Sequence, residues 1–513
     1  MVDRNRTAEE AAKLTKARVH KSQEKYGQKL GTEPVQFSSP ERLRMLADNE
    51  QGDARLIMKA LKGKFCFDKR RSQIFIFDEY WQEDILEEVF QHANTHAVSQ
   101  YQDELSLQVR IKYDRNRTKE EQALASANEA RLRSRIKKLN GLTRMRNALK
   151  IASKGAGSLA ITGDEWNLDH YALQTRNALV DLRTGESRPG RPEDYINKAS
   201  PIEWLGLDTD APTWEAAFRD IFNTDEGAHY FQKVLGASLI GKPLQKFFIL
   251  LGEGANGKST ILETAKKVLG PLAGAISPEM IMGYRPKGGG ADPELLDLQG
   301  KRLVWTSETR DGAKLNIEIV KQFTGNDTLK GRLNYSNSIV EFRPQFTLFL
   351  LTNNAPVVQD NGHATWRRIE LIPFSNRFVS MPTKENEKAK IADLEEKLEL
   401  ELPGILAWLV RGCLDYQKEG LDAPEEILAA TKQYRDEEDK LQRFVKERCA
   451  PGGSVTAGAF RAAYAEWLKK EYGHSTRVPS FAKIKEAMTN KGYESESDSR
   501  HSYYLGISIS EES

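Results

Sequence analysis

The segment that most constrains the fold is an apolar run followed by a glycine-rich loop. Residues 247–251 read FFILL, which has the length and composition of a strand buried on both faces of a parallel sheet. The next eight residues, GEGANGKS, fit the pattern G-x-x-x-x-G-K-[ST] and lead into an amphipathic segment. In such a unit the loop N–H groups and the positive end of the following helix bind phosphate. The sequence therefore predicts an α/β fold with a phosphate cradle formed by Gly252, Gly254, Ala255, Asn256, Gly257, Lys258, Ser259 and Thr260.

Two residues of this loop have predicted chemical roles. Lys258 is expected to reach the β- and γ-phosphates, and the hydroxyl of Ser259 is expected to ligate Mg²⁺. ATP and Mg²⁺ are therefore the predicted ligands. A chance match in a glycine-rich turn is the alternative, and the flanking strand and helix weigh against it.

A phosphate cradle alone does not hydrolyse a nucleotide, because hydrolysis also needs a group that orients water. A second apolar strand, in KRLVWTSETRDG, ends at Glu308, and Ser307 stands where an aspartate commonly precedes that glutamate. Glu308 is the predicted water-polarising carboxylate and, with Ser259, the predicted metal site. A third apolar strand, 345–351, runs into Asn353, whose amide is predicted to sense the γ-phosphate. The alternatives are a solvated glutamate and a turn-capping asparagine.

Two adjacent arginines, Arg367 and Arg368, directly precede a fourth apolar strand. One of them is predicted to act as an arginine finger across a subunit boundary, while the other pairs locally. The sequence does not decide between them.

The segment TLKGRLNYSNSIVEF (328–342) alternates on both sides of a polar centre and predicts a β-hairpin. Lys330 and Arg332 are positioned to contact phosphates of DNA, and Tyr335 to stack on a base. A hairpin that only packs between subunits is the alternative.

Taken together, the order of these motifs resembles that of superfamily 3 helicases of the phage and plasmid replication type. It is similar to the helicase half of poxvirus and satellite-phage primase-helicases, over roughly residues 160 to 510. The resemblance implies an AAA+ core, a homo-hexameric ring and 3′ to 5′ translocation on single-stranded or forked DNA. By position it assigns Walker A to Gly252, Gly257, Lys258 and Ser259, Walker B to Glu308, sensor 1 to Asn353, and the arginine region to Arg367 and Arg368.

Composition and periodicity divide the chain into six predicted parts. They are a charged helical extension (1–54), a mixed α/β domain (55–205), a helical collar (206–245), the helicase core (246–380), a helical connector (381–423) and a tail (424–513). In the tail, helices at 425–448, 456–471 and 479–491 precede two short alternating segments, which is typical of a winged helix. In the α/β domain, 71–77 predicts a strand, 78–93 a helix, and 121–151 one long basic helix.

The formal net charge is only +2, from 76 basic and 74 acidic residues, so any nucleic-acid surface must be local. One basic run, 131–150, contains no acidic residue, and either DNA contact or a solvated helix face explains it. In the tail, Lys483, Lys485 and Lys491 lie on a helix that either reads DNA or docks a protein. His92 and His96 have the spacing of a metal pair, but without a third ligand a plain helix face is the better interpretation.

No signal peptide, membrane span or cysteine metal site is evident, so a cytoplasmic protein is expected. The resemblance to phage and plasmid helicases implies a bacterial host cell. A separate primase or replication initiator is an expected partner, because the part before residue 160 shows no primase motif. Two other functions stay open: an initiator that uses ATP only to assemble on DNA, and a P-loop nucleotide kinase.

Overall fold

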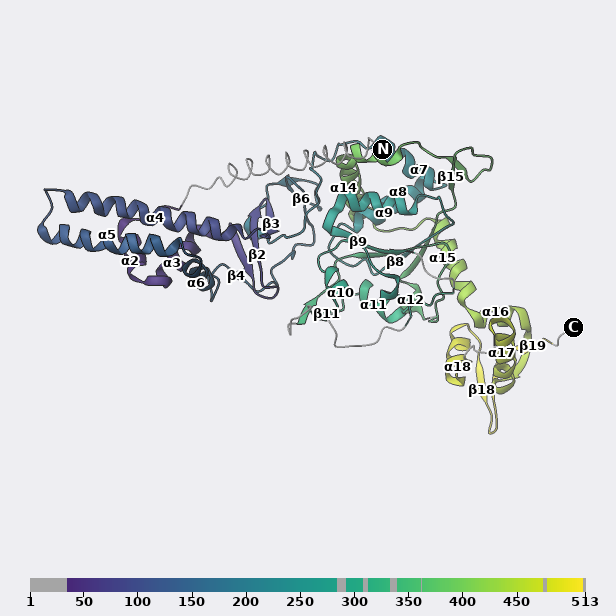
Figure 1. Ribbon diagram of the computed structural model, residues 1–513. Helices are drawn as coiled ribbons and strands as arrows, with labels where there is room; N and C mark the ends of the chain where they lie inside the picture. Colours follow the sequence, from purple (N-terminus) through teal and green to yellow (C-terminus); the bar gives the residue numbers. More distant parts are fainter. Residues whose placement is uncertain are drawn as a thin grey trace, which may run out of the picture. The chain divides into compact units, whose positions relative to one another are not determined.

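The computed structural model describes residues 35–283, 292–307, 312–332, 339–360, 362–473 and 478–510. Glu308 and Tyr335 therefore lie outside the described residues. The chain divides into two compact units (Figure 1). Of the described residues, the first holds 35–169 together with 174–179 and 187–199, and the second holds 170–173, 180–186 and those from Ser200 onward.

The first unit combines helices with a small sheet. Strands are ordered β3-β2-β1-β4, with β1 antiparallel to β2 and parallel to β4. Apolar residues of the helices and of β1 share one core. The elements are α2 (Ser39–Ala47), α3 (Asn49–Leu61), β1 (Phe65–Asp68), β2 (Gln73–Asp78), β3 (Tyr80–Glu83), α4 (Glu88–Tyr113), α5 (Lys119–Leu139), α6 (Leu142–Ala152) and β4 (Ala160–Ile161).

Residues 170–199, whose segments are divided between the two units, contain four short elements. They are β5 (Ala172–Gln174), β6 (Leu179–Asp181), β7 (Ser187–Arg188) and η1 (Pro192–Asp194).

The second unit is built on a five-stranded sheet ordered β14-β8-β13-β10-β9, in which every neighbouring pair is parallel. The predicted parallel sheet is thus present. Its strands are β8 (Phe247–Leu251), β9 (Ala273–Ala275), β10 (Leu303–Ser307), β13 (Thr347–Thr352) and β14 (Ile369–Pro373).

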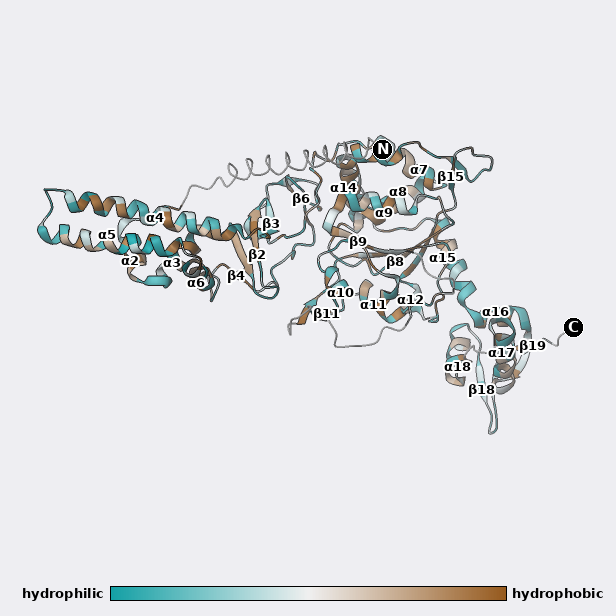
Figure 2. Ribbon diagram, viewed as in Figure 1, coloured by the Kyte–Doolittle hydropathy of each residue, from teal (hydrophilic) through white to brown (hydrophobic). Residues whose placement is uncertain are grey.

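Helices cover both faces of this sheet (Figure 1), and Figure 2 shows its strands in the brown of hydrophobic residues. On one face Phe231 of α8 packs against Phe349 of β13, and on the other α10 and α11 complete an apolar core with β8 and β13. The helices are α7 (Pro212–Ile221), α8 (Asp225–Ala237), α9 (Lys258–Leu269), α10 (Pro293–Asp297), α11 (Ile317–Thr324), α12 (His363–Trp366), α13 (Leu394–Leu400), α14 (Leu402–Glu419) and α15 (Glu425–Glu438). Smaller elements are η2 (Gly270–Leu272), η3 (Pro278–Met280), β11 (Leu329–Arg332), β12 (Ile339–Phe342), β15 (Arg377–Val379) and β16 (Glu387–Ala389).

The tail has its own core around Phe444, Phe460 and Trp467. Its three strands are ordered β17-β19-β18. The elements are α16 (Lys440–Arg448), β17 (Cys449–Thr456), α17 (Ala457–Tyr472), α18 (Phe481–Asn490), β18 (Ser495–Ser497) and β19 (Ser502–Ile509).

Two predicted helix boundaries in the first unit are wrong. The expected helix at 78–93 begins only at Glu88, because Trp81 is buried and pairs in β3, with its indole donating to Pro192 O at 2.9 Å. The Asp84 carboxylate then accepts from Glu88 N and Val89 N and starts α4. The expected single helix at 121–151 is interrupted at Asn140 and Gly141, which separate α5 from α6.

The tail also differs from its predicted outline. The helix expected at 425–448 is two helices, because the Asp439 side chain accepts from Gln442 N at 3.0 Å and starts α16. β17 was not predicted, and its pairing with β19 shifts register between Pro451 and Ser454.

Candidate nucleotide site

The glycine-rich loop lies where the chain order in the sheet reverses. The connection after β8 leads through α9 to β9 on one edge, whereas the connection after β13 leads to β14 on the opposite side of β8. In open parallel sheets, ligands bind at the carboxyl ends of the strands beside such a reversal. The loop therefore occupies the favoured binding position of this sheet.

Both ends of the loop require glycine. A Cβ on Gly252 would lie 2.4 Å from Phe374 O, and one on Gly257 would lie 2.7 Å from Ile221 Cδ1. Gly257 also has φ +87°, which disfavours other residues. A Cβ on Gly254 would meet nothing within 4 Å, so the middle of the loop faces open space.

The loop conformation is held by the chain that follows β14. Ala255 has φ +62°, and its carbonyl accepts from Phe378 N at 2.7 Å. The buried Asn256 donates from Nδ2 to Phe374 O at 3.4 Å and accepts from Lys258 N at 3.5 Å. The cradle is thus preformed by protein contacts alone.

Lys258 is the group best suited to an anion. Its side chain is buried, and its ammonium donates to Gly252 O. Burial lowers the pKa of Lys258 to about 8. The described residues provide no carboxylate partner for it, and a phosphate would supply the missing negative charge.

The N-terminus of α9 is also suited to bind an anion. Gly257 is its N-cap residue and provides no side-chain cap, so the first N–H groups remain for a ligand. Ser259 and Thr260 follow in the first turn and are exposed. The hydroxyl of Ser259 is a ligand type that fits Mg²⁺.

Asn353 lies beside this loop. Thr352 pairs with Leu251, and Gly252 N donates to Thr352 O at 3.2 Å. The exposed Asn353 comes next in the chain. On the next strand Ser307 pairs with Leu351, and the predicted Glu308 follows it outside the described residues.

The two arginines lie at the amino ends of the strands, whereas the loop lies at the carboxyl ends. Arg368 precedes β14, and its carbonyl accepts from Phe247 N at the start of β8. The backbone of Arg368 is therefore roughly 20 Å from Gly252, counting about 3.3 Å per strand residue, which is beyond the reach of an arginine side chain. The structure brings Lys258 and Asn353 together but does not bring either arginine to the same loop.

The environments of the arginines differ. Arg367 is exposed. Arg368 is partly buried, donates from Nη1 to Ala364 O at 2.6 Å, and has no partner for Nε among the described residues. Burial, followed by the charge of Arg367, lowers the pKa of Arg368. Arg367 is thus the one free to reach outward.

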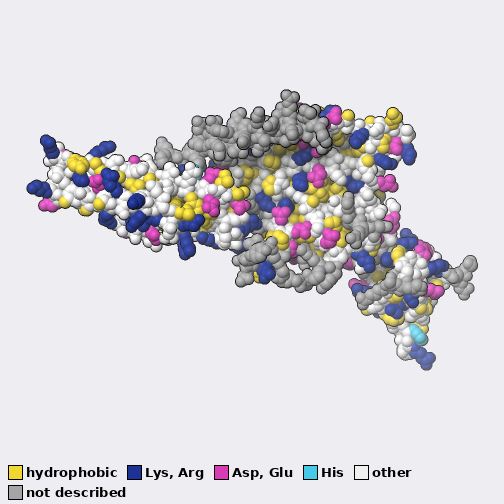
Figure 3. Space-filling view, in the orientation of Figure 1, with side chains coloured by type: hydrophobic (Ala, Val, Ile, Leu, Met, Phe, Trp, Pro, Cys, Tyr) yellow, Lys and Arg dark blue, Asp and Glu magenta, His cyan; other side chains and the backbone are white. Residues whose placement is uncertain are grey.

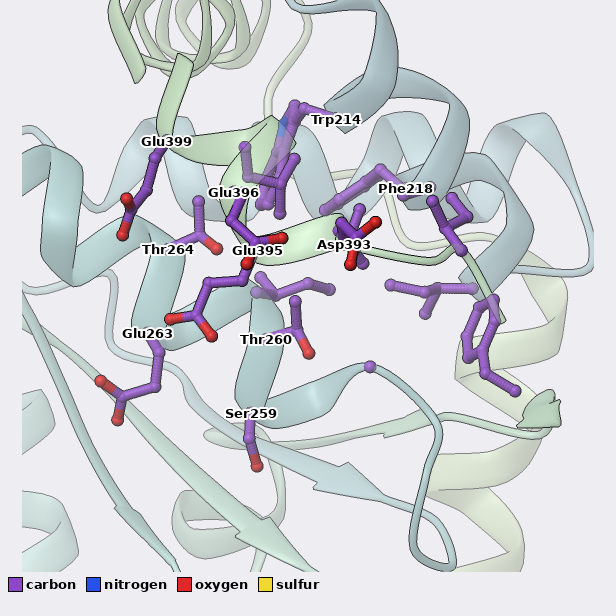
Figure 4. Close-up of a pocket in the computed structure, with 18 of the residues that line it drawn as sticks. Trp214, Phe218, Ser259, Thr260, Glu263, Thr264, Asp393, Glu395, Glu396 and Glu399 are labelled. Atoms are coloured by element: carbon purple, nitrogen blue, oxygen red, sulfur yellow. The ribbon is translucent and has the colours of Figure 1, made fainter. Parts of the chain in front are cut away.

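A cavity of about 690 Å³ adjoins the loop, a size within the usual range for small-molecule sites. Its lining includes Ala255, Ser259 and Thr260 together with Trp214 and Phe218 of α7. Figure 4 shows the two aromatic side chains on the far side of the cavity from Ser259. The apolar wall is completed by Ile221, Ile261, Phe378, Ile391, Leu394, Leu398 and Leu402.

One rim of the cavity is acidic. Glu395, Glu396 and Glu399 of α13 contribute to the lining (Figure 4). Glu395 and Glu399 each accept from the ammonium of Lys267 at 2.7 Å, which ties α13 to α9. The Lys267 ammonium lowers the pKa of Glu395.

The sequence did not predict this wall, which includes Trp214. Trp214 does pack, with its ring centroid 5.4 Å from that of Trp408, but it also lines the cavity. No local pattern marks these residues, because α7, α9 and α13 come together only in the fold.

The hairpin predicted at 328–342 has paired strands. Leu329 pairs with Phe342 and Arg332 with Ile339. Lys330 makes an ion pair with Glu341 at 2.8 Å, whereas Arg332 is exposed and makes no ion pair with any described residue. The predicted Tyr335 lies outside the described residues.

The structure also describes the contacts of the lysines of the tail helix and of the His92 and His96 pair. In the tail helix α18, Lys483 and Lys485 are exposed, whereas Lys491 forms an ion pair with Asp439. His92 approaches Glu88 at 4.0 Å, and His96 is partly buried, so burial lowers its pKa. Across the described ranges, no group of three or more His, Cys, Asp or Glu side chains is arranged to hold a metal ion.

Of the helices that are described, none combines the length and the apolar composition needed to cross a membrane.

Comparison with known proteins gives matches over parts of the chain. Residues 54–223 match the protein family described as D5 N terminal like. The chain is 30% identical over 326 residues to Putative helicase L207/L206 of Acanthamoeba polyphaga mimivirus, covering 60% of this chain and 34% of that protein. It is 28% identical over 275 residues to Putative helicase 022R of Frog virus 3, covering 51% of this chain and 28% of the relative. It is 29% identical over 164 residues to Primase D5 of fowlpox virus, covering 31% and 20%.

A solved structure, the apo form of the NrS-1 C terminal region, aligns over 89% of this chain and 99% of that one. The TM-score is 0.42 with 12% identity, which is too low to establish a shared fold.

The chain spans about a third or less of the length of these curated relatives. None of the three is named as a phage or plasmid protein, so the expected bacterial host gains no support from them. Over the matched stretches, the chain is similar to the D5 N terminal like family and to viral proteins named as putative helicases and as Primase D5.

Proposed function

We propose that this protein is an ATP-hydrolysing DNA helicase of the superfamily 3 type, with an AAA+ core and a winged-helix tail. It acts as a hexameric ring that moves 3′ to 5′ on single-stranded DNA. The observation that carries the proposal is the preformed glycine loop with the buried Lys258, at the point where strand order reverses. The names of the viral relatives support the DNA-replication role.

In the proposed reaction Lys258 binds the β- and γ-phosphates, and the α9 N-terminus adds its N–H groups. The base and sugar occupy the cavity beside Trp214 and Phe218. Ser259 would hold Mg²⁺, which when bound neutralises the negative charge of the phosphates. Glu308 orients the attacking water, and Asn353 contacts the γ-phosphate.

The position of Arg367 favours a site shared between subunits. It is exposed at the amino end of β14, whereas the loop of its own chain lies at the carboxyl end of β8. In a head-to-tail ring, each subunit contacts its neighbour through two different surfaces, one on each side. Arg367 of each subunit therefore serves the nucleotide of the next one.

The experiment is an ATPase assay with and without single-stranded DNA, run beside the unwinding of a forked duplex. The wild-type protein should hydrolyse ATP faster with DNA and separate the strands. Lys258→Met should abolish both activities by weakening nucleotide binding, while Lys266→Met in the same helix serves as the control. Glu308→Gln should retain ATP binding and lose strand separation.

Other outcomes would replace the proposal. An initiator that uses ATP only to assemble would retain its function in Glu308→Gln. A nucleotide kinase would transfer phosphate to a nucleoside monophosphate and ignore DNA. An assembled oligomer whose hydrolysis is indifferent to DNA and which unwinds nothing contradicts the helicase function.

A further inference from the structure

The end of α5, all of α6 and the turn after it form the most basic stretch of the first unit. No acidic residue occurs between positions 131 and 154. The basic residues there are Arg131, Arg133, Arg135, Lys137, Lys138, Arg144, Arg146, Lys150 and Lys154. Figure 3 shows more dark blue than magenta side chains on the visible face of this unit.

Three of these side chains form ion pairs within the unit, with two carboxylates. Arg135 and Arg144 form ion pairs with the fully buried Asp53, at 2.7 and 2.6 Å. Arg133 pairs with Glu129 at 2.9 Å. The pairs with Asp53 link α5 and α6 to α3, and all three ion pairs make the arginines less available to an external partner.

A second group has no such partners. Arg146, Lys150 and Lys154 are exposed, and none makes an ion pair with any described residue. They are four residues apart, so the first two lie on one stripe of α6 and Lys154 continues it in the turn that follows. The rise of the helix separates such positions by about 6 Å along its axis.

Lys69 extends this stripe from another element. The parallel pairing of Phe67 with Ala160 brings the end of β1 beside the turn after α6. The Lys69 ammonium donates to Ser153 Oγ at 3.1 Å. Partial burial, followed by the positive charge of Lys154, lowers the pKa of Lys69. Two like charges are held close together, and a polyanion would relieve their repulsion.

We propose that the basic row, Lys69, Arg146, Lys150 and Lys154, binds the phosphate backbone of DNA outside the motor core. A run of unpaired cations at regular steps suits a polyphosphate better than a single small anion. Contacts of this kind position the nucleic acid without reading its sequence. The choice of DNA among polyanions rests on the proposed function.

The test compares two triple variants of the full chain. Arg146→Gln/Lys150→Gln/Lys154→Gln removes three charges from the row. The control, Arg110→Gln/Arg115→Gln/Lys119→Gln, removes three exposed charges near the far end of α5, about 30 Å away by helix rise. Circular dichroism checks that both variants fold.

The readout is the anisotropy of a labelled single-stranded 30-mer at several NaCl concentrations, without nucleotide. The row variant should bind about tenfold more weakly at low salt, and its slope of log K against log salt should fall by about 2, at roughly 0.7 per phosphate contact. The control variant should stay within about twofold of wild type. Equal affinity and slope in the two variants would overturn the proposal.

A competition separates DNA from an acidic protein partner. Polyglutamate of equal charge should displace the DNA poorly, and displacement as effective as by unlabelled DNA would also overturn the proposal. ATPase and unwinding assays on the same variants keep the two proposals apart. If the wild-type protein binds DNA through the basic row but does not unwind the fork, only the helicase function is contradicted. If the wild-type protein unwinds normally and the row variant binds DNA as well as the control variant does, only this inference is contradicted.

Discussion

Lys258 carries its positive charge in a place that water reaches poorly. The side chain is buried and its ammonium bonds to a carbonyl of its own loop, not to a carboxylate. Burial therefore disfavours the charged form of Lys258 until an anion binds beside it. This is the residue whose protonation should follow ligand binding most closely.

Nucleotide affinity should therefore fall as the pH is raised. Without a ligand, Lys258 is protonated below its pKa of about 8 and neutral above it. Binding of phosphate favours the charged form, so above that pH each bound nucleotide takes up a proton. Between pH 7 and pH 9 the Kd for ATP should rise about tenfold, as measured by calorimetry.

Lys258→Met supplies the control for this measurement. Its residual affinity should change little over the same pH interval. The same dependence in both proteins would assign the proton to another group.

At the scale of elements, ion pairs decide which basic residues remain available. In the β11–β12 hairpin, Glu341 neutralises Lys330, whereas Arg332 makes no ion pair with any described residue. In α5 and α6, Asp53 and Glu129 form ion pairs with three arginines and leave the basic row unpaired. A count of basic residues in either element overstates the charge that it presents.

In the hairpin, Arg332→Gln should weaken single-stranded DNA binding more than Lys330→Gln does. The reason is that the Lys330 ammonium is already held by Glu341, so no direct phosphate contact of Lys330 is lost. The loss of a direct contact of Arg332 outweighs the repulsion from the carboxylate that Lys330→Gln leaves unpaired. The salt slope should fall by about 0.7 for Arg332→Gln, and Glu341→Gln should increase affinity. Anisotropy titrations at two salt concentrations measure this order, and a larger effect of Lys330→Gln would contradict it.

In the first unit, Asp53→Ala should destabilise the packing of α3, α5 and α6. Asp53 accepts from Tyr101 Oη at 2.8 Å besides its two arginine partners, and its loss leaves the buried Arg135 without a counter-charge. Breaking a buried pair in this way costs about 3–5 kcal/mol. Hydrogen exchange of peptides from these helices measures the loss.

Asp48→Ala is the matched comparison, because Asp48 pairs with Arg55 at the exposed surface of the same unit. Exposed pairs contribute about 0–1 kcal/mol. An equal loss of hydrogen-exchange protection in the two variants would show that the buried Asp53 pairs stabilise the unit no more than the exposed Asp48 pair does.

At the scale of the whole molecule, the parallel direction of the strands separates side chains that one ATPase site would need close together. Lys258 and Asn353 lie at the carboxyl ends of β8 and β13, and Arg367 lies at the amino end of β14. A complete site under the proposed function therefore needs two copies of the chain.

Mixing of two inactive variants should restore activity. Lys258→Met and Arg367→Ala should each lack ATPase activity alone. In a randomly mixed ring at equal amounts, about a quarter of the interfaces join an intact loop to an intact arginine. ATPase assays across mixing ratios measure the recovery, and persistent inactivity of assembled mixtures would contradict action between subunits.

The sequence by itself determined the features that depend on neighbouring residues. The strand, glycine loop and helix around Lys258 follow from an apolar run, residues that allow unusual backbone angles, and an amphipathic repeat. The same local patterns predicted the parallel strands and the hairpin. Local patterns failed where a distant partner decides the conformation, as with Trp81 and Pro192 or Asp439 and its helix start.

Only the tertiary structure decided how separate segments combine. It placed the aromatic wall of α7 and the acidic rim of α13 beside the loop, and it put Arg367 at the opposite end of the strands. It also chose which arginines of the basic run pair with Asp53, more than 80 residues away in the chain. Contacts across such separations leave no periodic trace in the sequence, because they depend on how whole elements pack against one another.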